Sequence, residues 1–265
     1  MKWKLRMKKL LIDCGFLIQF AVDDFKGKYA GSFLGITWAF LQPLSTILVY
    51  WFVFQLGFRS QPVENVPFIL WLISGLIPWF FINEAIIGGT ASLVEYSYLV
   101  KKVLFNINIL PLAKITSTFF VQIFLILVTA LAMLVFGFYP NVYYLEVFFY
   151  AVYTVLLVTA ISYFTSAVYV FFKDVLQMVS IILQLIFWLT PMVWDISIMP
   201  DYVQKIVKLN PIYYVVSGYR NAFIYQKPLF SEGWLEVYYW VVLAILMAVG
   251  FGLFKKVKPH FADVL

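Results

Sequence analysis

Residues 109–136 read ILPLAKITSTFFVQIFLILVTALAMLVF, an apolar run interrupted by a single charged residue, Lys114. An α-helix rises about 1.5 Å per residue, so about 20 apolar residues carry it through a hydrocarbon core about 30 Å thick. The run is longer than that and its charge lies near one end. It therefore predicts a transmembrane helix.

The composition extends this interpretation to the whole chain. Of 265 residues, 64% are hydrophobic and 12% are charged, whereas soluble domains average about 25% charged residues. So little charge cannot coat a soluble globule. We therefore expect one domain, residues 1–265, with the all-α fold of an integral membrane protein and six transmembrane helices. The predicted spans are 34–58, 67–93, 109–136, 145–172, 175–194 and 234–254.

The segment before the first span has the pattern of a helix lying on a membrane surface. At helical spacing, residues 10–28 gather apolar side chains on one face and place Asp23 and Asp24 opposite. We expect an amphipathic interface helix within residues 1–30. Phe16 and Phe20 fall within the polar arc, where a protein partner covers them or they stay exposed as stray aromatics.

Residues 195–233, between spans five and six, are too polar to cross the membrane. They contain two short apolar stretches, 202–209 and 212–225, separated by Asn210 and Pro211. Irregular backbone at membrane depth is tolerated where protein buries it or where it lines a wet cavity. We expect two re-entrant half-helices that form an outer gate. Arg220 ties these half-helices together or, slightly less favoured, binds an anionic lipid headgroup or pyrophosphate as a bidentate donor.

Basic residues set the orientation, because Lys and Arg accumulate in cytoplasmic segments. With the N-terminus inside, most of them lie on the inner side. The basic residues left outside are Arg59, Lys205, Lys208, Arg220 and Lys227. Both termini, including the tail 255–265, are therefore expected in the cytoplasm. The net charge of +6 flanks the spans, which indicates contacts with membrane lipids and not with nucleic acid.

Catalytic chemistry is not predicted on this chain. Cys14 and His260 are the only cysteine and histidine, so no metal cluster or triad can be assembled from them. No G-x-x-x-x-G-K-[ST] phosphate loop occurs, so no nucleotide site and no cofactor are expected on this chain. A membrane enzyme would need an acid-base constellation, and Asp23 with Asp24 is the one adjacent carboxylate pair.

Polar and kinked positions within the spans are few. A charge near the bilayer centre costs about 3 kcal/mol unless it is paired, so we expect Glu84 on span two to contact Lys114 on span three. The alternative is a protonated Glu84 and a Lys114 that reaches the interface. Pro43 is expected to kink span one, because proline removes a backbone donor.

Aromatic residues make up 21% of the chain. Several lie on or beside the predicted spans, where they are candidates for lining a translocation path, because ring faces pack well against apolar C–H surfaces. The candidates are Trp38, Tyr50, Trp51, Phe54, Trp71, Trp79, Tyr139 and Tyr143. For any one of them a lipid-interface belt or ordinary packing is the more common explanation.

Four stretches together resemble a known family. They are KYAGSFLGITWAFLQP at 28–43, Phe172-Lys173-Asp174, Leu189-Thr190-Pro191-Met192 and FADVL at 261–265, with a weaker match at Leu209-Asn210-Pro211. They are similar to the permease subunits of type-two ABC exporters that move polysaccharides, the O-antigen and teichoic-acid exporter family. The resemblance covers both ends and most of the chain.

The resemblance implies a homodimeric channel that pairs with two separate ATPase subunits in a bacterial inner membrane. The implied cargo is a lipid-linked, O-antigen-like polysaccharide. It also implies that residues 95–106, between spans two and three, form a coupling helix that docks on the ATPase; a loop resting on lipid headgroups is the alternative. The docking candidates are Glu95, Tyr96, Tyr98, Leu99, Lys101, Lys102 and Phe105, joined by Phe16 and Phe20.

Two other functions remain open. The same architecture could carry another cargo, such as a lipid or a drug. An ion-coupled secondary transporter is less favoured, because that class uses several buried ionisable groups and repeated halves. Glu84 is nearly alone within the spans, and the sequence has no visible internal repeat.

Overall fold

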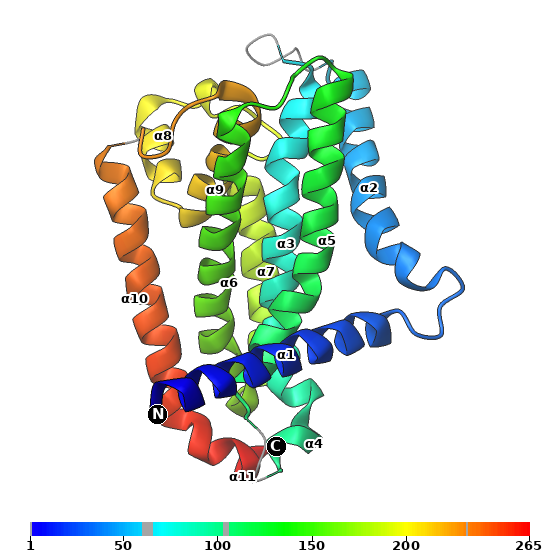
Figure 1. Cartoon of the computed structure of the whole chain (residues 1–265). Helices are drawn as coiled ribbons and strands as arrows, with labels where there is room; N and C mark the ends of the chain where they lie inside the picture. The colour runs from blue at the N-terminus through cyan, green and yellow to red at the C-terminus, as the bar shows by residue number, and fades with distance from the viewer. Residues whose placement is uncertain (1, 60–65, 103–105, 232) are drawn as a thin grey trace.

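The computed structural model describes residues 2–59, 66–102, 106–231 and 233–265, with side chains from Cys14 onward. The described residues form a bundle of helices (Figure 1). Helix α1 (Lys2–Lys28) lies across one end of this bundle. The short helices α4 (Ser97–Val100) and α11 (Phe261–Val264) and both termini lie at the same end, whereas α8 (Asp201–Lys208) lies at the opposite end.

Five apolar helical stretches in the described part of the chain are long enough to cross a membrane: Gly35–Gly57, Phe68–Glu95, Ile109–Val135, Val142–Phe171 and Trp234–Val264. They contain the long helices α2 (Trp38–Trp51), α3 (Phe68–Glu95), α5 (Ile109–Val135), α6 (Glu146–Phe171) and α10 (Trp234–Val257). Short 3₁₀ or π segments extend some of them, at Gly35–Thr37, Phe52–Gly57, Val142–Leu145 and Lys258–His260. An all-helical, multi-pass membrane protein is thereby confirmed.

The predicted fifth span, 175–194, forms a shorter helix. Helix α7 (Val175–Leu189) has 15 residues, which corresponds to about 22 Å. Its end is set by Pro191, because the residue before a proline is pushed out of the helical conformation. Thr190 accordingly has an extended backbone, with φ −97° and ψ 136°.

Helix α3 is the centre of the core. It packs against α5, α6 and α9 (Pro211–Arg220), and side chains such as Leu70, Leu72, Leu76 and Ile77 are fully buried. The outward faces of α2, α5, α7 and α10 instead expose leucine, isoleucine, valine and phenylalanine side chains. Such faces suit lipid or a second membrane protein, because water would not solvate them.

Helices α6 and α10 pack with their backbones in close approach. A Cβ added to Gly250 of α10 would overlap the backbone carbonyl oxygen of Ala160 on α6. A small residue at this position lets the two helices come together, as is common between helices in membranes. Two residues further on, a Cβ on Gly252 would have no heavy atom within 4 Å.

The two short apolar stretches at 202–209 and 212–225 form two short helices, as expected. They are α8 and α9, preceded by a 3₁₀ turn at Ile196–Ile198 and followed by a π turn at Asn221–Tyr225. Asn210 caps α9, since its side chain accepts from the Ile212 N–H and donates to Thr190 Oγ1, both at 2.9 Å. Pro211 occupies the first turn of α9, where its missing N–H costs nothing.

Candidate functional site

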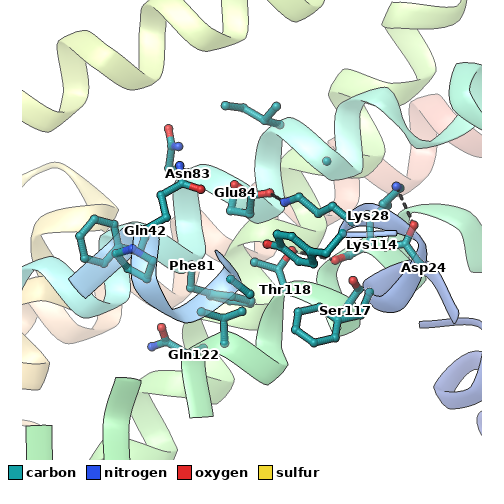
Figure 2. Close-up of a pocket in the computed structure, with 18 of the residues that line it drawn as sticks. Asp24, Lys28, Gln42, Phe81, Asn83, Glu84, Lys114, Ser117, Thr118 and Gln122 are labelled. Carbon is teal, nitrogen blue, oxygen red and sulfur yellow. Dashed lines mark hydrogen bonds and ion pairs between the residues drawn. The ribbon is translucent and has the colours of Figure 1, made fainter. Parts of the chain in front are cut away.

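A cavity of about 810 Å³ lies between α1 and the helices α2, α3 and α5 (Figure 2). Helix α3 runs towards the α1 end of the bundle and α5 runs away from it. Glu95 and Lys114 therefore lie near α1, whereas Trp79 and Gln122 lie deeper in the bundle. The cavity has a charged end beside α1 and a deeper end of amides, hydroxyls and aromatic rings.

Two groups of ion pairs fasten α1 to the long helices at the charged end (Figure 2). Lys28 bonds Glu84 on α3, and both side chains are nearly half exposed, at 45% and 47%. One turn earlier on α1, Asp24 pairs with Lys114 Nζ on α5 at 2.6 Å, with exposed fractions of only 4% and 12%. Lys114 also pairs with Glu95 at 2.7 Å.

The predicted contact between Glu84 and Lys114 is therefore wrong. Lys114 runs alongside Gly88, whose added Cβ would lie 3.8 Å from the Lys114 Cβ, and it pairs with Asp24 and Glu95. Glu84 instead pairs with the ammonium group of Lys28 on α1, and Lys114 pairs with the carboxylate of Asp24 on α1. Sequence reasoning placed α1 on the membrane surface and so missed Asp24 and Lys28, although their spacing of four residues puts them on one face of the helix.

Tyr96, the residue before α4, contacts the ion-paired side chains of Asp24 and Lys114. Its hydroxyl donates to Asp24 Oδ1, and its ring packs on Phe20 with centroids 5.1 Å apart. Lys114 Nζ lies 5.0 Å from the centroid of the same ring. Burial, and then the hydrogen bond to Asp24, raise the pKa of Tyr96 far above its ordinary value, so its hydroxyl remains a donor.

The half-exposed Lys28–Glu84 ion pair should contribute little to the stability of the protein. Burial acts to lower the pKa of Lys28, but the attraction of Glu84, the hydrogen bond to it and the nearby Tyr29 and Asp24 together raise the pKa, so Lys28 stays charged. Half-exposed ion pairs are typically worth less than about 1 kcal/mol. We expect Glu84→Gln to shift the free energy of unfolding by no more than that, and high salt to erase the difference. Equilibrium unfolding in detergent micelles at two salt concentrations tests this; a loss of several kcal/mol would contradict it.

The deeper lining carries groups that can bind a polyhydroxylated ligand. Gln42, Asn83 and Gln122 present side-chain amides from α2, α3 and α5, and Gln122 Nε2 donates to the Tyr219 hydroxyl at 2.9 Å. The hydroxyls of Thr46, Ser117 and Thr118 join the same lining. Pro43 lies within α2 and also lines the cavity.

The aromatic path candidates are dispersed in the structure. Tyr50 and Trp79 line the cavity, whereas Trp71 is buried, at 2% exposure, among α3 and α9 residues. Trp51 and Phe54 pack partly against the core. Trp38 at the start of α2 and Tyr139 after α5 are exposed, and Tyr143 lies in the turn before α6.

The docking candidates divide into outward and inward groups. Tyr98 on α4 is 59% exposed, and Lys101 and Lys102 are exposed beside it. Leu99 and Tyr96 pack against a second hydrophobic cluster, which includes Leu93, Val100 and Phe261. Phe16 is 44% exposed and stacks on Phe20. Because the Tyr96 ring packs on Phe20, Tyr96 of the same chain covers part of this aromatic pair. Phe105 lies outside the described residues.

Arg220 is buried within the protein and ties α9 to neighbouring segments. Its Nη1 donates to the Pro191 carbonyl at 2.6 Å and its Nη2 to the Met192 carbonyl at 2.8 Å. The guanidinium lies 3.6 Å from the centroid of the Trp71 ring. Gly75 leaves the space for it, since an added Cβ would lie 2.5 Å from Nη2. This geometry favours the structural role of Arg220 over a headgroup site.

No group of three or more His, Cys, Asp or Glu side chains within the described ranges could hold a metal ion. The side chains that line the cavity offer ion pairs, amides, hydroxyls and aromatic rings. Its charged end connects three helices, and its deeper end offers hydrogen-bond partners and ring faces.

Residues 18–224 match the family model described as ABC-2 type transporter. The chain is also similar to two named proteins over nearly its full length. It is 27% identical over 262 residues to the O-antigen export system permease protein RfbA of Klebsiella pneumoniae, a match that covers 97% of this chain and 99% of that protein. It is 28% identical over 255 residues to the protein of the same name from Myxococcus xanthus, covering 94% and 95%.

Proposed function

Because this chain belongs to the ABC-2 type transporter family, we propose that it is the permease that moves a lipid-linked, O-antigen-like polysaccharide across a bacterial inner membrane. The observation that carries the proposal is the end-to-end similarity to two proteins named O-antigen export system permease. The five membrane-length apolar helices of the described chain agree with a permease.

ATP binding and hydrolysis belong, in this proposal, to a separate subunit that holds ATP and Mg. The chain carries no phosphate-binding loop and would contribute no catalytic residue. Two copies of the chain would pair with two ATPase subunits, because two-fold pairing is the commonest way to enclose a shared pathway. The exposed apolar faces of α7 and of α2 with the π segment that follows it are available for such pairing; they include Leu48, Phe52, Leu185 and Trp188.

The orientation follows from the charge pattern. Helix α1, α4 and both termini would face the cytoplasm. Helix α7 would form the remaining, short span, and α8 and α9 would form the outer gate. The amides and hydroxyls of the deep cavity, with Trp79 and Tyr50, support a sugar cargo over a simple lipid, because they offer hydrogen bonds and ring faces together.

Docking on the ATPase is assigned to the exposed part of the segment after α3. Tyr98, Lys101 and Lys102 combine one aromatic anchor with two cations on the side where the termini lie. Interfaces concentrate their binding energy in a few residues, and tyrosine is enriched among them. Phe16 on α1 extends the same aromatic surface.

The test is co-purification of this chain with a candidate ATPase subunit from the same organism. Tyr98→Ala is expected to weaken the complex by about tenfold, the effect of removing an anchor worth more than about 1 kcal/mol. Tyr202→Ala is the matched control, since Tyr202 is 69% exposed on α8 at the opposite end of the bundle. Equal binding by the two variants would contradict the docking assignment, and a chain that finds no ATPase partner would contradict the proposed function.

A further inference from the structure

The face of α1 that meets the long helices carries three residues at four-residue spacing: Phe20, Asp24 and Lys28. Such spacing places them in one row along the helix. Phe20 packs on Tyr96, Asp24 bonds Tyr96 and Lys114, and Lys28 bonds Glu84 in the cavity. One row of α1 therefore contacts both Tyr96, at the start of the docking segment (residues 96–102), and Glu84 in the cavity wall.

Asp24 is the central member of this row. It is the buried carboxylate on which α1, α5 and the junction between α3 and α4 converge. Glu95 is the last residue of α3 and Tyr96 follows it, two residues before the exposed Tyr98 of α4. Lys114 holds Asp24 and Glu95 together, so the junction cannot shift without moving Asp24 or breaking these bonds.

We propose that Asp24 is a positioning residue that transmits movement of the docking segment through α1 to the cavity. The inference rests on the proposed function and adds a specific coupling element to it. A push on α4 displaces Tyr96 and Glu95. Tyr96 pulls on Asp24 directly, and Glu95 pulls on it through Lys114. Helix α1 then moves as a rod and carries Lys28, one turn further on, against Glu84.

The charges explain why this link is stiff. Two carboxylates, Asp24 and Glu95, share one ammonium group, and the Tyr96 hydroxyl supplies the further donor that Asp24 needs. The Asp24 and Lys114 side chains are only 4% and 12% exposed, and buried charges depend on their partners because a lone charge left in the same place is strongly unfavourable. Asp24, Lys114 and Tyr96 therefore move together, whereas the half-exposed Glu95 and the half-exposed Lys28–Glu84 pair can part from their partners and re-form these contacts in solvent.

The experiment uses the complex of this chain with its ATPase and measures ATP hydrolysis and polysaccharide export in parallel. Asp24→Asn keeps an acceptor oxygen for Tyr96 but removes the charge that holds Lys114. Tyr96→Phe keeps the ring on Phe20 and removes only the hydroxyl. Asp23→Asn is the matched control, because Asp23 is the exposed neighbour of Asp24 on the same helix.

We expect Asp24→Asn to lower export by about tenfold, within the range of known coupling between sites, and Tyr96→Phe to lower it less. Both variants should still bind the ATPase and hydrolyse ATP at nearly the unmodified rate, and Asp23→Asn should match the unmodified chain. Unchanged export in both variants would overturn the inference. So would equal loss of assembly, hydrolysis and export, since that marks a merely structural role. If the unmodified complex exports nothing, the proposed function itself fails and this link fails with it.

Discussion

Replacing Arg220 with methionine is expected to lower the free energy of unfolding by about 3 kcal/mol. The change leaves the Pro191 and Met192 carbonyl oxygens without their donors, and each buried unsatisfied group costs about 1–3 kcal/mol. It also removes the contact with the Trp71 ring, worth about 2 kcal/mol where water is excluded. Part of this loss is offset, because methionine avoids burying a charge. Equilibrium unfolding in mixed detergent micelles measures the net effect.

Two further variants test whether the loss of stability in Arg220→Met comes from the lost hydrogen bonds. Arg220→Lys keeps the charge but loses the planar fork that reaches two carbonyls, so an intermediate loss is expected. Lys227→Met is the control, because Lys227 is an exposed cation on the segment that follows α9 and its removal should leave stability unchanged. Equal stability of Arg220→Met and Lys227→Met would show that Arg220 does not hold α9 in place.

Adding one methyl group at Gly250 is expected to have the next largest effect on stability. The Cβ of Gly250→Ala meets the backbone carbonyl of Ala160, and a backbone atom cannot move aside as a flexible side chain can. Overpacking of this kind costs about 1–3 kcal/mol. Separation of α6 from α10 would register as a lower midpoint in thermal unfolding of the purified protein.

Gly252→Ala is the matched control for this prediction. It makes the same change two residues away on α10, where an added Cβ has open space. Alanine is a better helix former than glycine by about 1 kcal/mol, so Gly252→Ala should leave stability unchanged or slightly raised. The account of the α6–α10 contact fails if the two substitutions behave alike.

The long spans could be predicted from the sequence because length and hydrophobicity determine them locally. Residues 109–136 needed no partner to be recognised, and α5 covers Ile109–Val135. Helix α7 was less predictable in length, since the apolar run continues past Leu189 while Thr190 is already extended before Pro191. A hydropathy pattern does not register a backbone restriction of this kind.

The charged end of the cavity could not be predicted, because its partners come from a helix whose position no local pattern gives. Glu84 and Lys114 were singled out correctly as polar groups that need partners, but the nearest candidates along the spans were not the ones used. Asp24 and Lys28 reach them only because α1 lies across the bundle end (Figure 1). Tyr96 was expected to face an ATPase, yet its hydroxyl points inward to Asp24.

The most direct test of the central claim is to remove this chain from cells and follow the polysaccharide. The proposed permease predicts that surface polysaccharide disappears and that its lipid-linked form accumulates on the cytoplasmic side. Restoring the chain together with an active ATPase should return it to the surface, and restoring it with an ATPase that cannot hydrolyse ATP should not. Unchanged surface polysaccharide in cells that lack the chain would contradict the account.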